Sequence, residues 1–156
     1  MKRAVVAAFL MSAVAPVTSV AQSVNDVAGT YVLAAETREM DGIKTTLPTQ
    51  GSLSLGSNGR YMLTTFAPNL PKVASGNRMT ATPEEYKVIV SGSLAHYGTY
   101  SVVDKVLVFK VERSTFPNWD GMEQRRQFTL TGDELKYTLA NASGGGSVTL
   151  TWRRVN

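Results

Sequence analysis

The sequence predicts an all-β fold, an antiparallel up-and-down barrel of about eight strands with one short helix. Short stretches of alternating apolar and polar residues recur along the chain, separated by turns rich in glycine, asparagine and aspartate. Only one stretch carries the signals of a helix. A closed barrel is favoured because closure removes the exposed strand edges of a flat sheet. An open two-sheet sandwich is the alternative.

The beginning of the chain has the pattern of a secretory signal peptide. Two basic residues precede an apolar run over residues 4–14, and small residues then lead up to Ala21. This run is far shorter than the roughly 20 residues that cross a bilayer, so a transmembrane anchor is disfavoured. We therefore expect residues 1–21 to be cleaved after Ala21, leaving one barrel domain over residues 22–156 in the periplasm or outside the cell.

The first strands of the domain are bounded by turn signals. Asp41-Gly42 marks one turn, and Ser57-Asn58-Gly59 marks a hairpin, because asparagine and glycine both tolerate a positive φ angle. The strands predicted in this half are residues 29–38, 51–56 and 60–66. In the first of them, Tyr31, Leu33 and Ala35 share one face.

A helix is predicted to begin at Thr82. Thr82 is a good N-cap, Pro83 suits the first helical position, and Glu85 completes a capping box. Apolar residues from Tyr86 onward follow helical spacing and form a stripe that can cover an apolar surface. We expect this helix to end near His96.

Strands resume after the helix, again with turn residues between them. The predicted strands are residues 98–103, 106–114, 123–131, 134–140 and 147–155. The run Val106–Val111 is apolar on both faces, which indicates that its outer face is covered by the helix or by a partner.

Composition restricts the classes of partner. The chain has 156 residues and a net charge of +4, but Lys2 and Arg3 lie in the predicted signal peptide, which leaves 14 basic against 12 acidic residues. No basic run with interleaved aromatic residues indicates nucleic-acid binding. One histidine and no cysteine provide too few ligands for a metal site, and no phosphate-binding loop is present. We expect no cofactor, no metal and no stable membrane insertion; the oligomeric state stays open.

Several short motifs, taken in order, resemble the lipocalin-like domain family of bacteria and fungi, which are small calycin-type β-barrels. The motifs are Gly29-Thr30-Tyr31, Asn58-Gly59-Arg60-Tyr61, Thr82-Pro83-Glu84-Glu85-Tyr86, Gly98-Thr99-Tyr100, Phe116-Pro117-Asn118-Trp119 and Gly132-Asp133. The resemblance covers residues 29–155. It implies a barrel and, by analogy, a small hydrophobic or amphipathic ligand held in the cup.

Two details of the resemblance concern particular residues. Tyr31 stands where true lipocalins have tryptophan, and Trp152-Arg153-Arg154 resembles the final strand, whose arginine packs against that aromatic and closes the barrel floor. The family often carries histidine near Phe109 and Lys110, and this chain does not, so no catalytic role is carried over through such a histidine.

The candidate ligand-binding residues are aromatic or charged: Tyr61, Tyr97, Tyr100, Glu112, Phe116, Trp119, Arg126 and Phe128. If the hairpin around Trp119 folds symmetrically, Glu112 faces Arg126. This pair is either a polar anchor inside the cup or a structural cross-strand ion pair at the rim. The aromatic residues either line a pocket or fill the barrel completely.

Three functions are compatible with these residues. The first is binding of a small hydrophobic or amphipathic molecule in the cup. The second is isomerase- or cyclase-type catalysis by Glu112, His96 and Tyr100, for which a strongly shifted pKa inside a cavity would be evidence. In that case His96, the only histidine, is a general base; otherwise it is a helix C-terminal residue near the helix dipole. The third is a filled barrel that binds a protein partner through an exposed Trp119.

Overall fold

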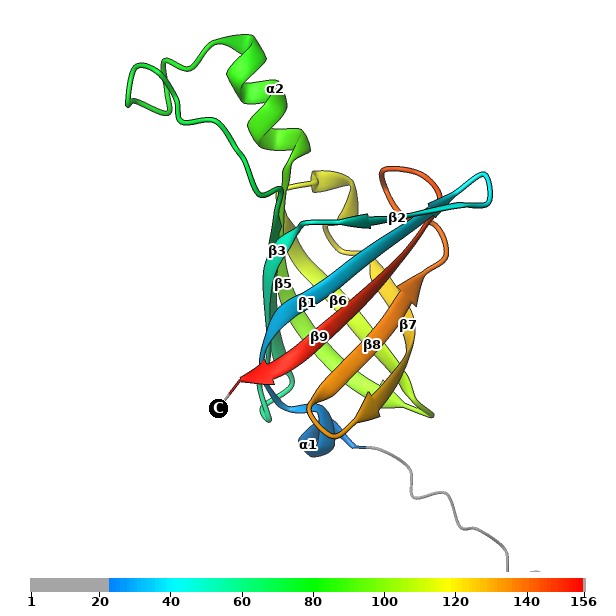
Figure 1. Ribbon diagram of the computed structural model, residues 1–156. Coiled ribbons are helices and arrows are strands. Elements are labelled where there is room, and N and C mark those ends of the chain that lie inside the picture. Colours follow the sequence, from blue (N-terminus) through cyan, green and yellow to red (C-terminus); the bar gives the residue numbers. More distant parts are fainter. Residues whose placement is uncertain (1–22, 156) are drawn as a thin grey trace, which may run out of the picture.

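A computed structural model describes residues 23–155 as one β-barrel (Figure 1). The strands form a single antiparallel sheet that closes through pairing of its first and last strands. The elements are α1 (Val24–Val27), β1 (Gly29–Met40), β2 (Ile43–Leu47), β3 (Gln50–Leu55), β4 (Arg60–Phe66), α2 (Pro83–Ser91), β5 (Ser93–Val103), β6 (Val106–Ser114), the 3-10 turn η1 (Pro117–Trp119), β7 (Glu123–Thr131), β8 (Glu134–Leu139) and β9 (Ser147–Val155). The predicted signal peptide lies outside the described residues.

The barrel has eight strand positions, because β2 and β3 share one of them. Both pair with the same side of β1, β3 with its first residues and β2 with its last, while β9 occupies the other side of β1. The predicted barrel of about eight strands is therefore confirmed and the open sandwich is wrong. The strand β2 was not predicted.

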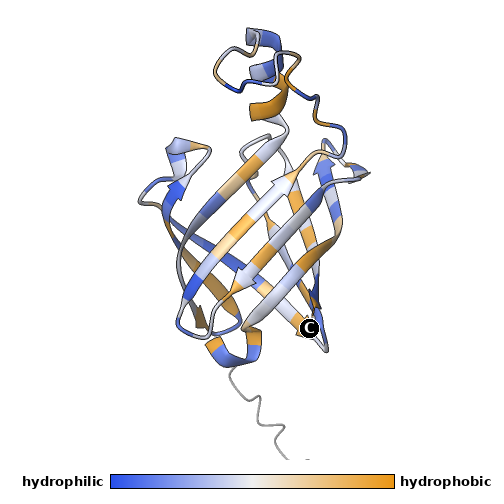
Figure 2. Ribbon diagram, turned by 90° about the vertical axis from the view of Figure 1, so that its left-hand side faces the viewer, coloured by the Kyte–Doolittle hydropathy of each residue, from blue (hydrophilic) through white to orange (hydrophobic). Residues whose placement is uncertain are grey.

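Alternation of apolar and polar residues along the strands builds the core (Figure 2). In β8, for example, Leu135 and Tyr137 are buried while Glu134 and Lys136 are exposed. The buried side chains form one cluster inside the barrel: Val27, Tyr31, Leu53, Leu55, Tyr61, Leu63, Tyr100, Leu107, Phe109, Phe128, Leu135, Tyr137, Val148, Leu150 and Trp152.

The helix α1 closes one end of the barrel, which we call the closed end. The Tyr31 hydroxyl donates to the Val27 carbonyl at 2.7 Å, and Val27 is fully buried. Arg154 donates to the same hydroxyl at 2.8 and 3.1 Å and to the Asp26 carbonyl at 2.7 Å, with its guanidinium 5.3 Å from the Tyr31 ring. The expected contact between the last strand's arginine and Tyr31 is confirmed.

The helix α2 starts as predicted but ends earlier. Thr82 and Glu85 form the capping box, with Thr82 N–H donating to Glu85 at 2.7 Å. The helix stops at Gly92 rather than near His96, because Ser93 already pairs with Phe66 across β4 and β5. Strand pairing there outweighs the helical pattern of the sequence.

The stripe of apolar residues on α2 does not cover the barrel. The helix and the loop before it project away from the barrel end opposite α1 (Figure 1), and no α2 residue is buried. Tyr86, Val88 and Val90 are all exposed. The expectation that this stripe, or the helix, would cover an apolar surface of the barrel is wrong.

The hairpin β6–β7 has a different register from the predicted one. Lys110 pairs with Glu123, and Leu107 pairs with Arg126, so the hairpin is not symmetric about Trp119. An irregularity between β5 and β6 leaves Glu112 as an extra residue, since Arg113 pairs with Tyr97 and Val111 with Gly98. Such a bulge changes which side chains face inward, and the sequence alone did not reveal it.

Candidate functional site

A cavity of about 500 Å³ opens at the end of the barrel opposite α1, and we call it the cup. This volume lies within the usual range of small-molecule sites, roughly 300–1,000 Å³. Its walls are largely apolar and come from most of the strands, the junction of α2 with β5, and the η1 loop. The apolar lining includes Leu63, Leu94, Phe116, Trp119, Leu139, Val148 and Leu150.

His96 stands in the cup wall on β5 and is 2% exposed. Its Nδ1 lies 2.9 Å from the Tyr61 hydroxyl, and its ring meets that of Trp119 edge-to-face at 5.5 Å. Burial, together with the positive charge of Arg126, lowers the pKa of His96 from 6.5 to about 3. The imidazole is therefore neutral at physiological pH. Burial raises the pKa of Tyr61, so its hydroxyl keeps its proton.

Arg126 brings a buried positive charge to the cup from β7. Its side chain is 3% exposed, and it donates to the Tyr137 hydroxyl at 3.1 Å and to Gln124 Oε1 at 2.5 Å. The guanidinium lies 4.9 Å from the Phe109 ring and 5.0 Å from the Tyr137 ring. Within residues 23–155 it forms no ion pair. Aromatic faces and neutral acceptors thus stabilise a charge that has no carboxylate partner.

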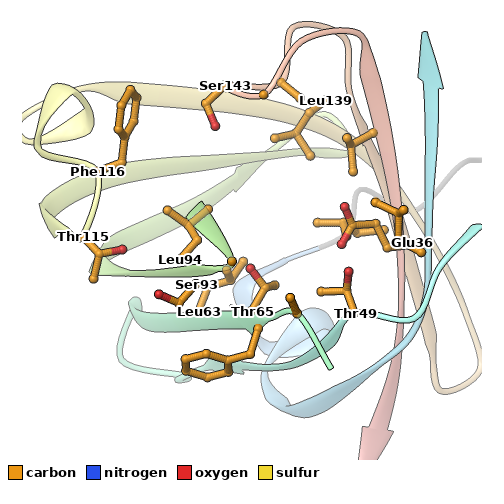
Figure 3. A pocket seen from close by; sticks show the side chains of 18 of the residues that line it. Glu36, Thr49, Leu63, Thr65, Ser93, Leu94, Thr115, Phe116, Leu139 and Ser143 are labelled. Atoms are coloured by element: carbon orange, nitrogen blue, oxygen red, sulfur yellow. The ribbon is translucent and has the colours of Figure 1, made fainter. Parts of the chain in front are cut away.

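Glu36 and Arg38 reach the cup from β1. Figure 3 shows the Glu36 carboxyl group pointing into the space between the other lining side chains. Glu36 is 8% exposed and makes no hydrogen bond or ion pair in the described part of the chain. Arg38 donates to the Gly144 carbonyl at 3.0 Å, whereas its Nε is buried without a partner there.

Comparison with known proteins identifies the family. The sequence model of the lipocalin-like domain matches residues 28–155, which is most of the chain. The chain belongs to the lipocalin-like domain family. It is also similar to the 4'-hydroxy-3'-methoxypropiophenone carrier protein ppsC of Aspergillus oryzae, with 27% identity over 100 residues, covering 56% of this chain and 90% of that protein.

Three of the eight predicted site residues line the cup of this lipocalin-like domain, and a fourth lies just behind its wall. Phe116, Trp119 and Arg126 line the cavity, and the Phe116 and Trp119 rings meet edge-to-face at 5.7 Å. Tyr61 lies behind His96 and reaches the cup only through it.

The other four predicted residues do not line the cup. Tyr97 and Glu112 are on the outer surface, where Glu112 accepts from both terminal nitrogens of Arg60 at 2.5 and 2.9 Å. The predicted pairing of Glu112 with Arg126 is therefore wrong. Tyr100 and Phe128 are buried in the packed core below the cavity.

From the sequence, two polar residues of the cup were missed and a third was placed in the wrong element. His96 was placed on a helix end and instead lies on β5. Glu36 and Arg38 were missed because β1 carries an extra residue between Leu33 and Ala35, which shifts the inward face by one position. A strict alternation from Tyr31 sends both of these side chains outward.

Two further observations concern the part of the chain from residue 23 to residue 155. No group of three or more histidine, cysteine, aspartate or glutamate side chains there is arranged to hold a metal ion. No helix in that part is long and apolar enough to span a membrane.

Proposed function

We propose that this protein is a carrier that holds one small amphipathic molecule in the cup. The buried guanidinium of Arg126 carries the proposal, because it stands in the wall of an otherwise largely apolar cavity and has no carboxylate partner among residues 23–155. Apolar walls with a few placed polar groups are typical of small-molecule sites. An acceptor oxygen on the ligand would satisfy the guanidinium and gain a charge-assisted hydrogen bond.

The relative from Aspergillus oryzae suggests the ligand class. Its name describes its cargo as an aromatic ketone with a hydroxyl and a methoxy group. A compact aromatic ring of this kind suits a cavity of about 500 Å³ whose rim carries Phe116 and Trp119. We therefore propose a small aromatic molecule with at least one acceptor oxygen as the cargo of this protein.

Two features favour a carrier over the alternative functions. A base whose pKa is about 3 is poorly matched to proton transfer near neutral pH, where an efficient general base titrates close to the working pH. This weighs against His96 as the base of an isomerase or cyclase. Trp119 lines the cavity and packs on His96, which supports a role in the cup rather than on a protein partner.

Titration calorimetry of residues 22–156 with 4'-hydroxy-3'-methoxypropiophenone tests the carrier function. We expect saturable binding with one molecule per chain. Arg126→Met should weaken it at least about 10-fold, since a hydrogen bond to a charged group contributes roughly 1.5–3 kcal/mol. Arg125→Met is the matched control, because Arg125 is the neighbouring arginine on the outer face of β7.

The outcome that contradicts the carrier function is a wild-type protein that binds neither this ketone nor any member of a broad panel of lipophilic compounds. Native mass spectrometry of the protein purified from its own host adds an independent measurement. A bound small molecule that is lost on Trp119→Ala supports the cup as its site.

We also propose that the protein acts in the periplasm or outside the cell, on the basis of the signal-peptide pattern in residues 1–21. Amino-terminal sequencing of the exported protein should give Gln22 as the first residue. A full-length protein that starts at Met1 and stays in the cytoplasm would contradict this localisation.

A further inference from the structure

The polar groups of the cup stand on opposite walls of the barrel. Around the barrel the strands follow the order β1, β3, β4, β5, β6, β7, β8, β9 and back to β1. Glu36 on β1 is therefore three strands from His96 on β5 in one direction and three strands from Arg126 on β7 in the other. In a barrel of eight positions, this separation places the carboxyl group across the cavity from the imidazole and the guanidinium.

The wall with Arg126 and His96 presents hydrogen-bond donors. Two of the five guanidinium N–H groups are used by Tyr137 and Gln124, and the rest have no partner within residues 23–155. The Tyr61 hydroxyl has no acceptor there other than His96 Nδ1, so it donates to Nδ1. The proton of the neutral imidazole is then on Nε2, which adds a second donor to this wall.

The opposite wall presents the Glu36 carboxyl group as an acceptor, next to the Arg38 guanidinium, which donates to the Gly144 carbonyl and whose Nε has no partner within residues 23–155. Glu36 is 8% exposed as a residue, and its carboxyl group points into the cavity (Figure 3) and receives no hydrogen bond from any residue in 23–155. Because this carboxyl group opens onto the cavity, a bound molecule can supply the hydrogen-bond donor that residues 23–155 do not.

From this arrangement we infer that the cup recognises its ligand at two ends. A carbonyl or carboxylate oxygen of the ligand accepts from Arg126 and His96, and a hydroxyl group at its far end donates to Glu36. The ligand class is a compact molecule, mainly apolar in the middle, with an acceptor oxygen at one end and a hydroxyl at the other. This inference rests on the proposed carrier function and adds the orientation and chemistry of the bound molecule.

Titration calorimetry with three related compounds tests the inference: one compound has both polar ends, and each of the other two lacks one of them. The probe 4'-hydroxy-3'-methoxypropiophenone has both ends, 3',4'-dimethoxypropiophenone lacks the hydroxyl donor, and 2-methoxy-4-propylphenol lacks the ketone. For the wild-type protein, removing either end should weaken binding at least about 10-fold.

The variants should show a crossed pattern. In Glu36→Met, loss of the ligand's hydroxyl should change the affinity less than 3-fold, while loss of its ketone should still weaken binding about 10-fold. In Arg126→Met, loss of the ketone should change the affinity less than 3-fold, while loss of the ligand's hydroxyl should still weaken binding about 10-fold. Glu39→Met is the control for the first variant, because Glu39 is on the same strand but does not line the cup. Thermal unfolding of each variant verifies that it is folded.

Two results would overturn the inference and leave the carrier function standing. One is equal binding of all three probes by the wild-type protein, or the same ranking of probes in Glu36→Met as in wild type. The other is tight binding of purely apolar compounds with no affinity for the two-ended ketone. If Arg126→Met does not fold, the Glu36→Met series alone decides the question at the hydroxyl end.

Discussion

Arg154 at the closed end and Arg126 at the cup are both arginines held against aromatic rings, but their surroundings differ. Arg154 donates to a hydroxyl and a carbonyl that are themselves part of the α1 closure. Arg126 has neutral partners, and across the cavity Glu36 and Arg38 Nε have none within residues 23–155. At the closed end, Arg154, the Tyr31 hydroxyl and the Asp26 carbonyl thus satisfy one another, whereas the cup leaves several polar groups for a bound molecule. Substitutions at the closed end should therefore cost stability, and those at the cup should cost affinity.

The largest loss of stability is expected for Trp152→Ala. Trp152 is fully buried in the core and does not line the cup. Truncation of a buried tryptophan typically costs about 3–5 kcal/mol of unfolding free energy, because a cavity remains. Urea denaturation measures this cost. Trp119→Ala is the comparison at the cup and should cost much less; an equal cost for both would contradict the distinction between the packed core and the cup.

A smaller loss is expected for Arg154→Met. It leaves the Asp26 carbonyl without the Arg154 donor and removes two donors from the Tyr31 hydroxyl, so we expect a decrease of about 1–3 kcal/mol. The neighbouring Arg153 is exposed, and Arg153→Met should change the free energy of unfolding little. Arg126→Met should cost less than Arg154→Met. It removes the donors to Tyr137 and Gln124, but the variant no longer buries a charge that lacks an ion partner within residues 23–155. A loss for Arg126→Met as large as that for Arg154→Met would contradict the comparison.

The free energy of unfolding should depend on pH through His96, which lies in the cup wall. The pKa of His96 is 6.5 when unfolded and about 3 when folded, so between these values the unfolded chain binds more protons. Stability is then fully present above pH 6.5 and is lost as pH falls toward 3. At pH 5 the loss amounts to about 2 kcal/mol relative to neutral pH.

Urea denaturation at pH 7.5 and pH 5 provides the measurement, with His96→Gln as the comparison. Because this is the only histidine in the sequence, most of the difference between the two pH values should disappear in the variant. An unchanged difference would show that other groups cause it.

The smallest effect is expected for Glu112→Gln. Glu112 and Arg60 form their ion pair on the outer surface, and exposed pairs contribute little. Neither the melting temperature nor the affinity for any cup ligand should change measurably. A loss of affinity would mean that the outer surface takes part in binding.

The sequence was sufficient for the barrel, the capping box and the closure by Arg154, because these depend on local alternation, local capping and a recognisable order of motifs. It was not sufficient for the polar groups of the cup. Glu36 faces inward only because β1 has an extra residue. Glu112 was misplaced because the β6–β7 register differs from the symmetric one that was assumed. Bulges depend on how the strands coil around the closed barrel, which is a property of the whole sheet. Arg126 was identified from its residue type, although its predicted partner was wrong.

The segment from Ala67 to Gly92 leaves and re-enters the barrel at adjacent points, where Ala67 N–H donates to the Gly92 carbonyl at 2.7 Å. The strands on either side are already in register up to Phe66 and Ser93, so this segment is not needed to close the sheet. Its last residues, however, form part of the cup rim. The segment is thus an exchangeable module: evolution or protein engineering can lengthen, shorten or replace it to change which molecules enter, while the barrel beneath keeps its fold.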